Sequence, residues 1–359
     1  MEPMLFSPAR LGALELRNRI VLAPMTRCRA IGNVPNAMMA EYYAQRAGFG
    51  LLITEGTAPS ANGLGYARIP GVFSPEQVAG WRLVTDAVRA QGGKIFLQLM
   101  HVGRVAHRDN MAEGARVVAP SAVPLEGDMW TDSGGMQPHT PPEAMTEADI
   151  DQAIAEFVQA ARNAIAAGFH GVELHGANGY LIEQFLAANT NRRTDHYGGS
   201  EMNRARFALE VARAVADAVG GERVGIRLSP YGVFNGIEPY GESMAWYLAQ
   251  ELSRIGLVYL HTVDHAAMGA PEVPRSCIDG MRERFEGSFV LSGGYTDAAR
   301  AEADLQAGRG DLIAFGRAGL ANPDLPERLR KGAALNEADP NTFYTAGPEG
   351  HTDYPTLGA

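Results

Sequence analysis

Short apolar segments recur along this chain and predict its strands. There are eight: RIVLAP (19–24), LLITEGT (51–57), KIFLQLMH (94–101), GVELHGA (171–177), VGIRLSP (224–230), LVYLHTVD (257–264), SFVLSGG (288–294) and LIAFGR (312–317). Most of each segment is apolar at both odd and even positions, which is typical of parallel strands buried on both faces.

Between these segments the apolar residues follow a helical period. The clearest predicted helices span residues 75–91, 146–168 and 201–220. Gly168, Gly220 and Gly308 stand where such helices should end, as glycine commonly does before the chain enters the next strand. Strand and helix therefore alternate, and eight units predict an α/β protein with a closed (β/α)8 TIM barrel. An open dinucleotide-binding sheet would need G-x-G-x-x-G after its first strand, where this chain has APMTRCRA.

Two segments lie outside the repeating pattern. Residues 102–146, after the third strand, are rich in Gly, Pro and Ser and too long for an ordinary connection, so we expect a cap over the barrel mouth. The segment before the first strand has Gly12 at its centre and predicts an N-terminal β-hairpin that closes the barrel bottom. No linker divides the sequence, and we expect one domain over residues 1–359.

Composition narrows the possible partners. The formal net charge of −10 disfavours nucleic acid, whose phosphates are held by clustered Lys and Arg. No apolar stretch approaches the ~18 residues of a membrane span, so no membrane contact and a cytoplasmic location are expected. Cys28 and Cys277 are the two cysteines, too few for a cysteine metal site or iron–sulfur cluster.

In a barrel of this type the active site lies at the carboxyl ends of the strands. Those positions carry Pro24, Met25, Thr26, Gly56, Gln98, His175, Asn178, Arg227, His261, Gly293, Gly294, Gly316 and Arg317. Thr26, Gln98 and Arg227 offer hydrogen bonds to a flat heteroaromatic ring. The glycine turns after strands seven and eight match a phosphate site, to which Arg317 adds charge. The set predicts a phosphorylated ring cofactor.

Single residues from this set also have purely structural interpretations. Gln98 could satisfy a neighbouring backbone group, and Arg227 could pair with a core acid such as Glu55 or Glu173. Their shared position at one end of eight strands favours a functional site.

Several stretches resemble the Old Yellow Enzyme family of FMN-dependent ene-reductases. They include LRNRIVLAPMTR, FLQLMHVGRVAH, VELHGANGYLIEQFLAANTNRRTDHYGGS, IAFGRAGLANPDLPERL and GHTDYP, and the similarity spans residues 5 to about 355. The resemblance implies a (β/α)8 barrel, one non-covalent FMN, NADPH or NADH as hydride donor, and an activated alkene as substrate.

The same resemblance assigns roles within HGANGY, residues 175–180. His175 and Asn178 correspond to the pair that donates hydrogen bonds to the substrate's carbonyl or nitro oxygen, and Tyr180 to the proton donor. Hydride delivery from FMN to the β-carbon leaves negative charge on that oxygen, where donors stabilise it. Tyr180, whose type has an ordinary pKa near 10, then protonates the α-carbon from the opposite face.

For the flavin, the resemblance implies backbone contacts and a few side-chain ligands. Pro24, Met25 and Gly56 would contact the ring through the backbone and Thr26 through its hydroxyl. Gln98 and Arg227 would bind the pyrimidine side, and Gly293, Gly294, Gly316 and Arg317 would hold the phosphate.

Two positions bear on subclass and substrate. Thr26 stands where one branch of the family has Cys, so the resemblance implies the classical subclass. Met100 stands where many relatives have Trp beside the substrate, so we expect a wider pocket. Tyr66 and Tyr344 are expected to line the same cavity.

Alternatives remain from sequence alone. The flavin and the oxygen-binding pair would also serve a nitrate-ester or nitroaromatic reductase, and a non-catalytic FMN-binding protein is the alternative outside enzymes. A monomer or a homodimer fits the sequence equally well.

Overall fold

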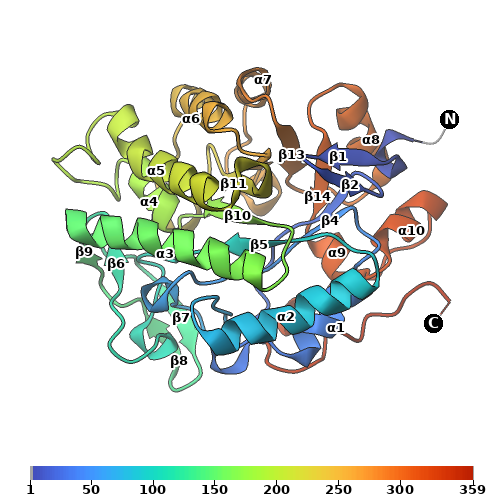
Figure 1. Cartoon of the computed structure of the whole chain (residues 1–359), viewed down its shortest axis with the longest axis horizontal. Helices are drawn as coiled ribbons and strands as arrows, with labels where there is room; N and C mark the ends of the chain where they lie inside the picture. Colours follow the sequence, from blue (N-terminus) through green and yellow to red (C-terminus); the bar gives the residue numbers. More distant parts are fainter. Residues whose placement is uncertain (1–2, 359) are drawn as a thin grey trace.

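The computed structural model describes residues 3–358 and contains the predicted barrel (Figure 1). Eight parallel strands close in the order β10-β11-β12-β13-β14-β3-β4-β5. They are β3 (Ile20–Leu22), β4 (Leu51–Ile53), β5 (Ile95–Leu99), β10 (Gly171–Gly176), β11 (Val224–Leu228), β12 (Tyr259–Val263), β13 (Ser288–Ser292) and β14 (Leu312–Phe315). Each lies inside one of the eight apolar segments, so the fold class predicted from the sequence is confirmed.

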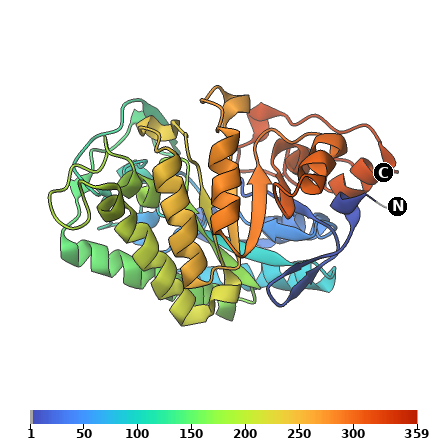
Figure 2. The same ribbon diagram turned by 90° about the horizontal axis from the view of Figure 1, so that it is seen from above.

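Helices flank the barrel on the outside (Figure 2). They are α1 (Ala37–Gln45), α2 (Pro75–Ala90), α3 (Glu147–Ala166), α4 (Leu181–Leu186), α5 (Glu201–Val219), α6 (Glu242–Ile255), α7 (Arg275–Arg284), α8 (Ala298–Gln306), α9 (Arg317–Ala321) and α10 (Leu325–Lys331). The three clearest predicted helices match α2, α3 and α5 to within two residues at each end. Gly220 ends α5 with a φ of 94°, a conformation that favours glycine. None of the helices described over residues 3–358 has the length and apolarity to cross a membrane.

Strand alternation produces two cores. Outward-facing residues such as Leu97, Leu174 and Ile226 pack against the helices. Inward-facing residues such as Phe96 and Tyr259 fill the barrel interior. Because side chains alternate along a strand, the next inward residues in β5 and β12 are Gln98 and His261. The barrel interior therefore changes from apolar to polar toward the carboxyl ends of these strands.

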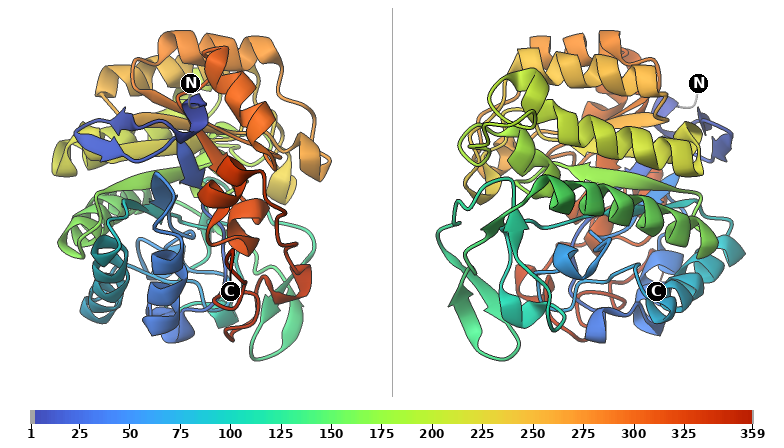
Figure 3. Two further views of the ribbon diagram at one scale, coloured as in Figure 1. Left: turned by 90° about the vertical axis from the view of Figure 1, so that its right-hand side faces the viewer. Right: turned by 60° about the vertical axis from the view of Figure 1, so that its left-hand side comes forward.

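The two segments outside the repeating pattern lie at opposite ends of the molecule (Figures 1 and 3). At one end, β1 (Ala9–Leu11) and β2 (Leu14–Leu16) form the predicted antiparallel hairpin, and its apolar residues join the interior core. At the other end, residues 102–146 contain β6 (Val118–Ala119), β7 (Asp128–Thr131), β8 (Gly135–Pro138) and β9 (Glu143–Ala144). β7 and β8 form a second hairpin that projects from the molecule, and β6 pairs with β9.

Gly225 provides a test of packing inside the barrel. A Cβ at this position would lie 2.2 Å from Cζ of Tyr259 on the neighbouring strand. We expect Gly225→Ala to lower the free energy of unfolding by about 1–3 kcal/mol through overpacking. Gly48→Ala is the matched control, because a Cβ there meets nothing within 4 Å. Urea titration of both variants measures the difference, and equal stability of the two would contradict this packing.

Candidate functional site

A buried carboxylate organises the polar end of the barrel interior. Glu173 in β10 accepts hydrogen bonds from Gln98 Nε2 at 2.8 Å, Tyr259 Oη at 3.0 Å and His261 Nδ1 at 2.8 Å. Burial alone would raise the pKa of Glu173, but His261, Arg227 and Gln98 lower it overall. The carboxyl group is therefore ionised, and its network joins β5, β10 and β12.

Arg227 in β11 lies between His175 and His261 in strand register. Its side chain is buried, and its Nε has no hydrogen-bond partner among the described residues. The oxygens of Glu173 bond instead to Gln98, Tyr259 and His261. The interpretation of Arg227 as a simple partner of a core acid therefore fails at the level of hydrogen bonds, although the negative charge of Glu173 supports its protonation. A buried guanidinium donor without a partner fits a site for a ligand with acceptor atoms, as a flavin ring has.

β4 pairs with β5, which carries Gln98, and β3 is the next strand beyond β4 in the barrel. Pro24 is buried, whereas Met25 and Thr26 are partly exposed. Gly56 follows β4, and a Cβ on it would lie 2.4 Å from Sδ of Met100. Met100 therefore packs directly over Gly56, and any side chain at position 56 would displace it.

The glycine turns after β13 and β14 are neighbours, because these two strands pair. Gly293 and Gly294 have φ of 128° and 66°, and a Cβ on Gly293 would lie 2.3 Å from the carbonyl oxygen of Asp264. Only glycine fits this close approach. Gly316 precedes the first turn of α9, where the exposed Arg317 begins the helix. Arg317 follows the second turn, and Arg300 Nη1 donates to the Gly294 carbonyl oxygen of the first at 3.1 Å, so both turns have a cation beside them.

His175 is held in one protonation state. Its Nδ1 accepts a hydrogen bond from the backbone N–H of Ala177 at 3.3 Å. Burial, together with the charges of Arg227, His261 and His265, lowers the pKa of His175 well below its usual value. The neutral ring therefore carries its proton on Nε2, where it can only donate. A backbone N–H rather than a carbonyl thus contacts Nδ1 of His175.

Tyr180 lies against His175. The two rings meet edge to face with centroids 4.9 Å apart, and Tyr180 stands at the N-terminus of α4. Its hydroxyl is 3.2 Å from that of Tyr66. Burial raises the pKa of Tyr180 to about 12, above the ordinary value near 10, while the hydrogen bond from Tyr66 lowers it. Tyr180 is therefore protonated at any physiological pH.

Further predicted residues gather around this pair. Met100 lies in one apolar cluster with Tyr66 and Tyr180. Tyr344 is more exposed and lies at the rim, where its backbone oxygen accepts a hydrogen bond from Arg68 at 2.9 Å. Arg68 also donates to the backbone oxygen of Cys28 and pairs with Asp132, next to the β7–β8 hairpin. Sequence reasoning did not identify Arg68, because its three contacts lie far apart in the chain.

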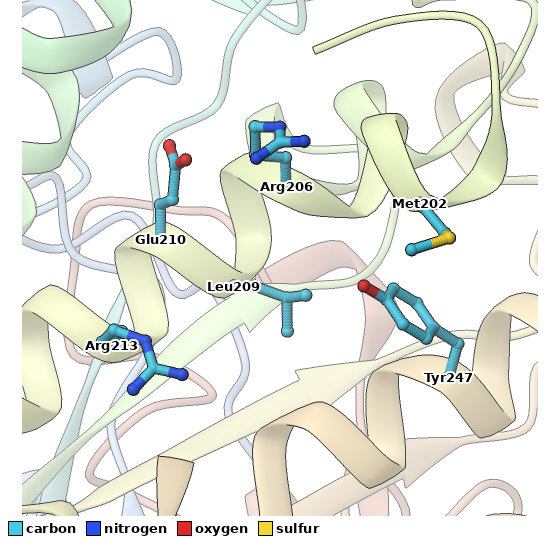
Figure 4. A pocket seen from close by; sticks show the side chains of 6 residues that line it. All are labelled: Met202, Arg206, Leu209, Glu210, Arg213 and Tyr247. Atoms are coloured by element: carbon cyan, nitrogen blue, oxygen red, sulfur yellow. The ribbon is translucent and has the colours of Figure 1, made fainter. Parts of the chain in front are cut away.

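Other features of the structure do not contribute to this site. A hollow on the outside of the barrel, between α5 and α6, is lined by Met202, Arg206, Leu209, Glu210, Arg213 and Tyr247 (Figure 4). It contains none of the predicted site residues. Within residues 3–358, no cluster of His, Cys, Asp and Glu could hold a metal ion.

Known proteins are similar to this chain in both sequence and fold. Residues 4–336 match the family described as NADH:flavin oxidoreductase / NADH oxidase. The chain is 44% identical to 12-oxophytodienoate reductase 1 of Oryza sativa subsp. japonica over 360 residues, which cover 98% of the chain and 93% of the relative. It is 42% identical to a probable flavin mononucleotide-dependent alkene reductase of Leishmania infantum over 360 residues, covering 99% and 98%.

Solved structures agree. Morphinone reductase is 48% identical, with a TM-score of 0.95 over 99% of this chain and 97% of that one. A structure of morphinone reductase in complex with tetrahydroNAD has a TM-score of 0.93 over 99% and 98% of the two chains. The chain therefore belongs to the Old Yellow Enzyme family of FMN-dependent, NAD(P)H-linked alkene reductases.

Proposed function

We propose that this enzyme reduces the C=C bond of an α,β-unsaturated carbonyl compound or a nitroalkene. The observation that carries the proposal is the fixed state of His175, a neutral donor beside a protonated Tyr180 at the carboxyl end of β10. One group can bind an oxygen that gains negative charge, and the other can supply a proton. Relatives named for reduction of 12-oxophytodienoate and morphinone support the same chemistry.

FMN, when bound, takes hydride from NADPH or NADH and supplies it to the alkene. Its ring would be held by the buried donors Gln98 and Arg227 and by the strand ends opposite them. Its phosphate would lie at the two neighbouring glycine turns. The complete proposed set is Pro24, Met25, Thr26, Gly56, Gln98, Arg227, Gly293, Gly294, Gly316 and Arg317. The positive charge of Arg227 would favour the anionic reduced ring.

His175 and Asn178 would bind the activating oxygen of the substrate. As the β-carbon gains hydride, negative charge develops on this oxygen, and preorganised N–H donors stabilise it in a buried site. Neither donor titrates in the working range: the pKa of His175 is held low by burial, and an amide does not ionise. The same pair could bind a nicotinamide amide, which would explain how one pocket serves both half-reactions.

Tyr180 would then protonate the α-carbon. A pKa of about 12 makes it a weak acid, so loss of its proton needs support. Tyr66 provides that support, because its hydroxyl can donate a hydrogen bond to the Tyr180 oxygen after that oxygen has lost its proton. A proton from solvent then restores Tyr180.

The decisive experiment is an anaerobic visible spectrum of the purified protein. We expect flavin bands at roughly 370 and 450 nm that bleach with NADPH or NADH and return when 2-cyclohexenone is added. Bleaching without return by any enone or nitroalkene would overturn the proposed substrate class and leave nitrate esters and nitroaromatics as candidates. Bleaching by neither nicotinamide would indicate a non-catalytic flavin protein.

Two tyrosine variants separate the proton donor from its neighbour. We expect Tyr180→Phe to lower kcat for enone reduction by about 10²- to 10⁴-fold, the usual contribution of a general acid. Tyr66→Phe keeps the donor but removes the hydroxyl that stabilises its conjugate base, and we expect a loss of about 10-fold. Stopped-flow flavin reduction by NADPH is the control and should change little in either variant. Unchanged saturated-product formation in Tyr180→Phe would exclude this residue as the proton donor.

Met100 tests the width of the pocket. Because its flexible side chain packs over Gly56 and beside Tyr66 and Tyr180, a larger rigid ring at this position should narrow the substrate's choice of pose. We expect Met100→Trp to reduce activity on enones with bulky α- or β-substituents relative to 2-cyclohexenone, or to change the product's enantiomeric excess. Met100→Leu is the control of similar volume. An identical substrate range and stereochemistry in Met100→Trp would rule out this role.

A further inference from the structure

The backbone that carries Asn178 has an unusual conformation. Asn178 and Gly179 have consecutive positive φ values of 60° and 77°. At Gly179 a Cβ would lie 2.5 Å from the carbonyl oxygen of Phe234, so only glycine fits there. Asn adopts this region more readily than most residues, but two successive left-handed residues still need neighbours that hold the turn in one orientation.

Two buried side chains hold the N–H groups of this turn. The Asn178 N–H donates to Ser229 Oγ at 3.0 Å, and the Gly179 N–H donates to Glu183 Oε2 at 2.6 Å. Ser229 Oγ in turn donates to Glu183 Oε1 at 2.5 Å. One carboxyl group, from the first turn of α4, therefore fixes both successive peptide units, directly or through Ser229.

Two further side chains, one of them also from α4, hold the carbonyl groups of the turn. Asn235 Nδ2 donates to the Asn178 carbonyl oxygen at 2.7 Å, and Gln184 Nε2 donates to that of Gly179 at 2.8 Å. Glu183 and Ser229 are themselves fully buried. Both side chains therefore act on the backbone of the turn from within the protein interior.

We propose that Glu183 and Ser229 are positioning residues that fix the Asn178–Gly179 turn and thereby aim the Asn178 amide at the substrate oxygen. The inference rests on the proposed function, because it takes Asn178 as an oxygen-binding donor. It adds a pair of residues that acts through Asn178, with no contact to flavin or alkene.

The charge state of Glu183 suggests a conservative variant. Burial raises the pKa of Glu183 to about 8, although Ser229, the Gly179 N–H and the charge of Arg227 lower it. Tyr240, also buried, is the other titratable neighbour that senses this carboxyl group. As a carboxylate, Glu183 accepts both hydrogen bonds, whereas the protonated acid still accepts from the Gly179 N–H and donates from Oε1 to Ser229 Oγ instead. Glutamine has the same shape and the same pair of capacities.

Variants at these two positions test the proposal through enone reduction. We expect Glu183→Ala to lower kcat/KM by about 100-fold, the size of effect that follows from misplacing a catalytic group by about 1 Å. Glu183→Gln should keep activity within about 3-fold of wild type, because its amide can replace both hydrogen bonds. Ser229→Ala leaves the carboxyl group in place and should cost about 10-fold. It gives a result even if Glu183→Ala fails to fold.

A double-mutant cycle separates positioning from general damage. If Glu183 acts through Asn178, adding Glu183→Ala or Ser229→Ala to Asn178→Ala should cost less than about 3-fold beyond Asn178→Ala alone. If the loss in kcat/KM of the double variant equals the product of the losses in the two single variants, the proposal is overturned. So would wild-type activity in folded, flavin-loaded Ser229→Ala and Glu183→Ala.

A matched control variant separates a loss of stability from a loss of positioning, and Asn178→Ala alone tests the proposed function. Glu302 also accepts two backbone N–H bonds, from Met4 at 2.9 Å and Leu5 at 2.8 Å, but in the N-terminal segment. Glu302→Ala should lower Tm without lowering kcat/KM. If Asn178→Ala itself keeps full activity, the oxygen-binding role in the proposed function fails. If Asn178→Ala loses activity while the Glu183 and Ser229 variants do not, only the positioning role fails.

Discussion

The structure of the site depends on one buried charge. A carboxylate inside a protein is stable only when its oxygens are fully hydrogen-bonded and a positive charge is near. Glu173 meets this condition through Gln98, Tyr259 and His261, with the Arg227 guanidinium close enough to lower its pKa. The network crosses the barrel interior, so it fixes side chains from several strands at once. The hydrogen bonds of Glu173 go to these neighbours, and a donor of Arg227 stays available.

The two ends of the barrel interior have different tasks. Near the hairpin, Phe96 and Tyr259 pack with apolar residues of β1 and β2 and close the interior. One inward position further along the same strands, the residues become polar and ionisable. Tyr259 joins the two layers, since its ring packs on Phe96 while its hydroxyl donates to Glu173. The apolar layer that closes the barrel and the polar layer that forms the site are thus adjacent layers of side chains.

Burial also sets the protonation states of the groups at the barrel mouth. It lowers the pKa of His175 and raises that of Tyr180, so both groups are neutral hydrogen-bond donors over the physiological range. In water a histidine would titrate near neutral pH. The backbone N–H of Ala177 removes the remaining freedom by fixing which ring nitrogen carries the proton. The same logic extends to the Asn178–Gly179 turn, where burial raises the pKa of Glu183.

The sequence by itself determined the elements and the end of the barrel at which polar residues gather. Apolar runs, helical spacing and terminating glycines such as Gly220 are local patterns, so they can be recognised in the sequence. Contacts between residues on different strands of the barrel cannot be recognised in this way. Gln98 and Glu173 are 75 positions apart, and Tyr66 and Tyr180 are 114 apart. From the sequence alone, Arg227 could pair with a core acid such as Glu55 or Glu173 or bind a ligand, and Tyr180 would have the ordinary pKa near 10. Only barrel closure decided both, because hydrogen-bond partners and burial exist only after distant strands have been brought together.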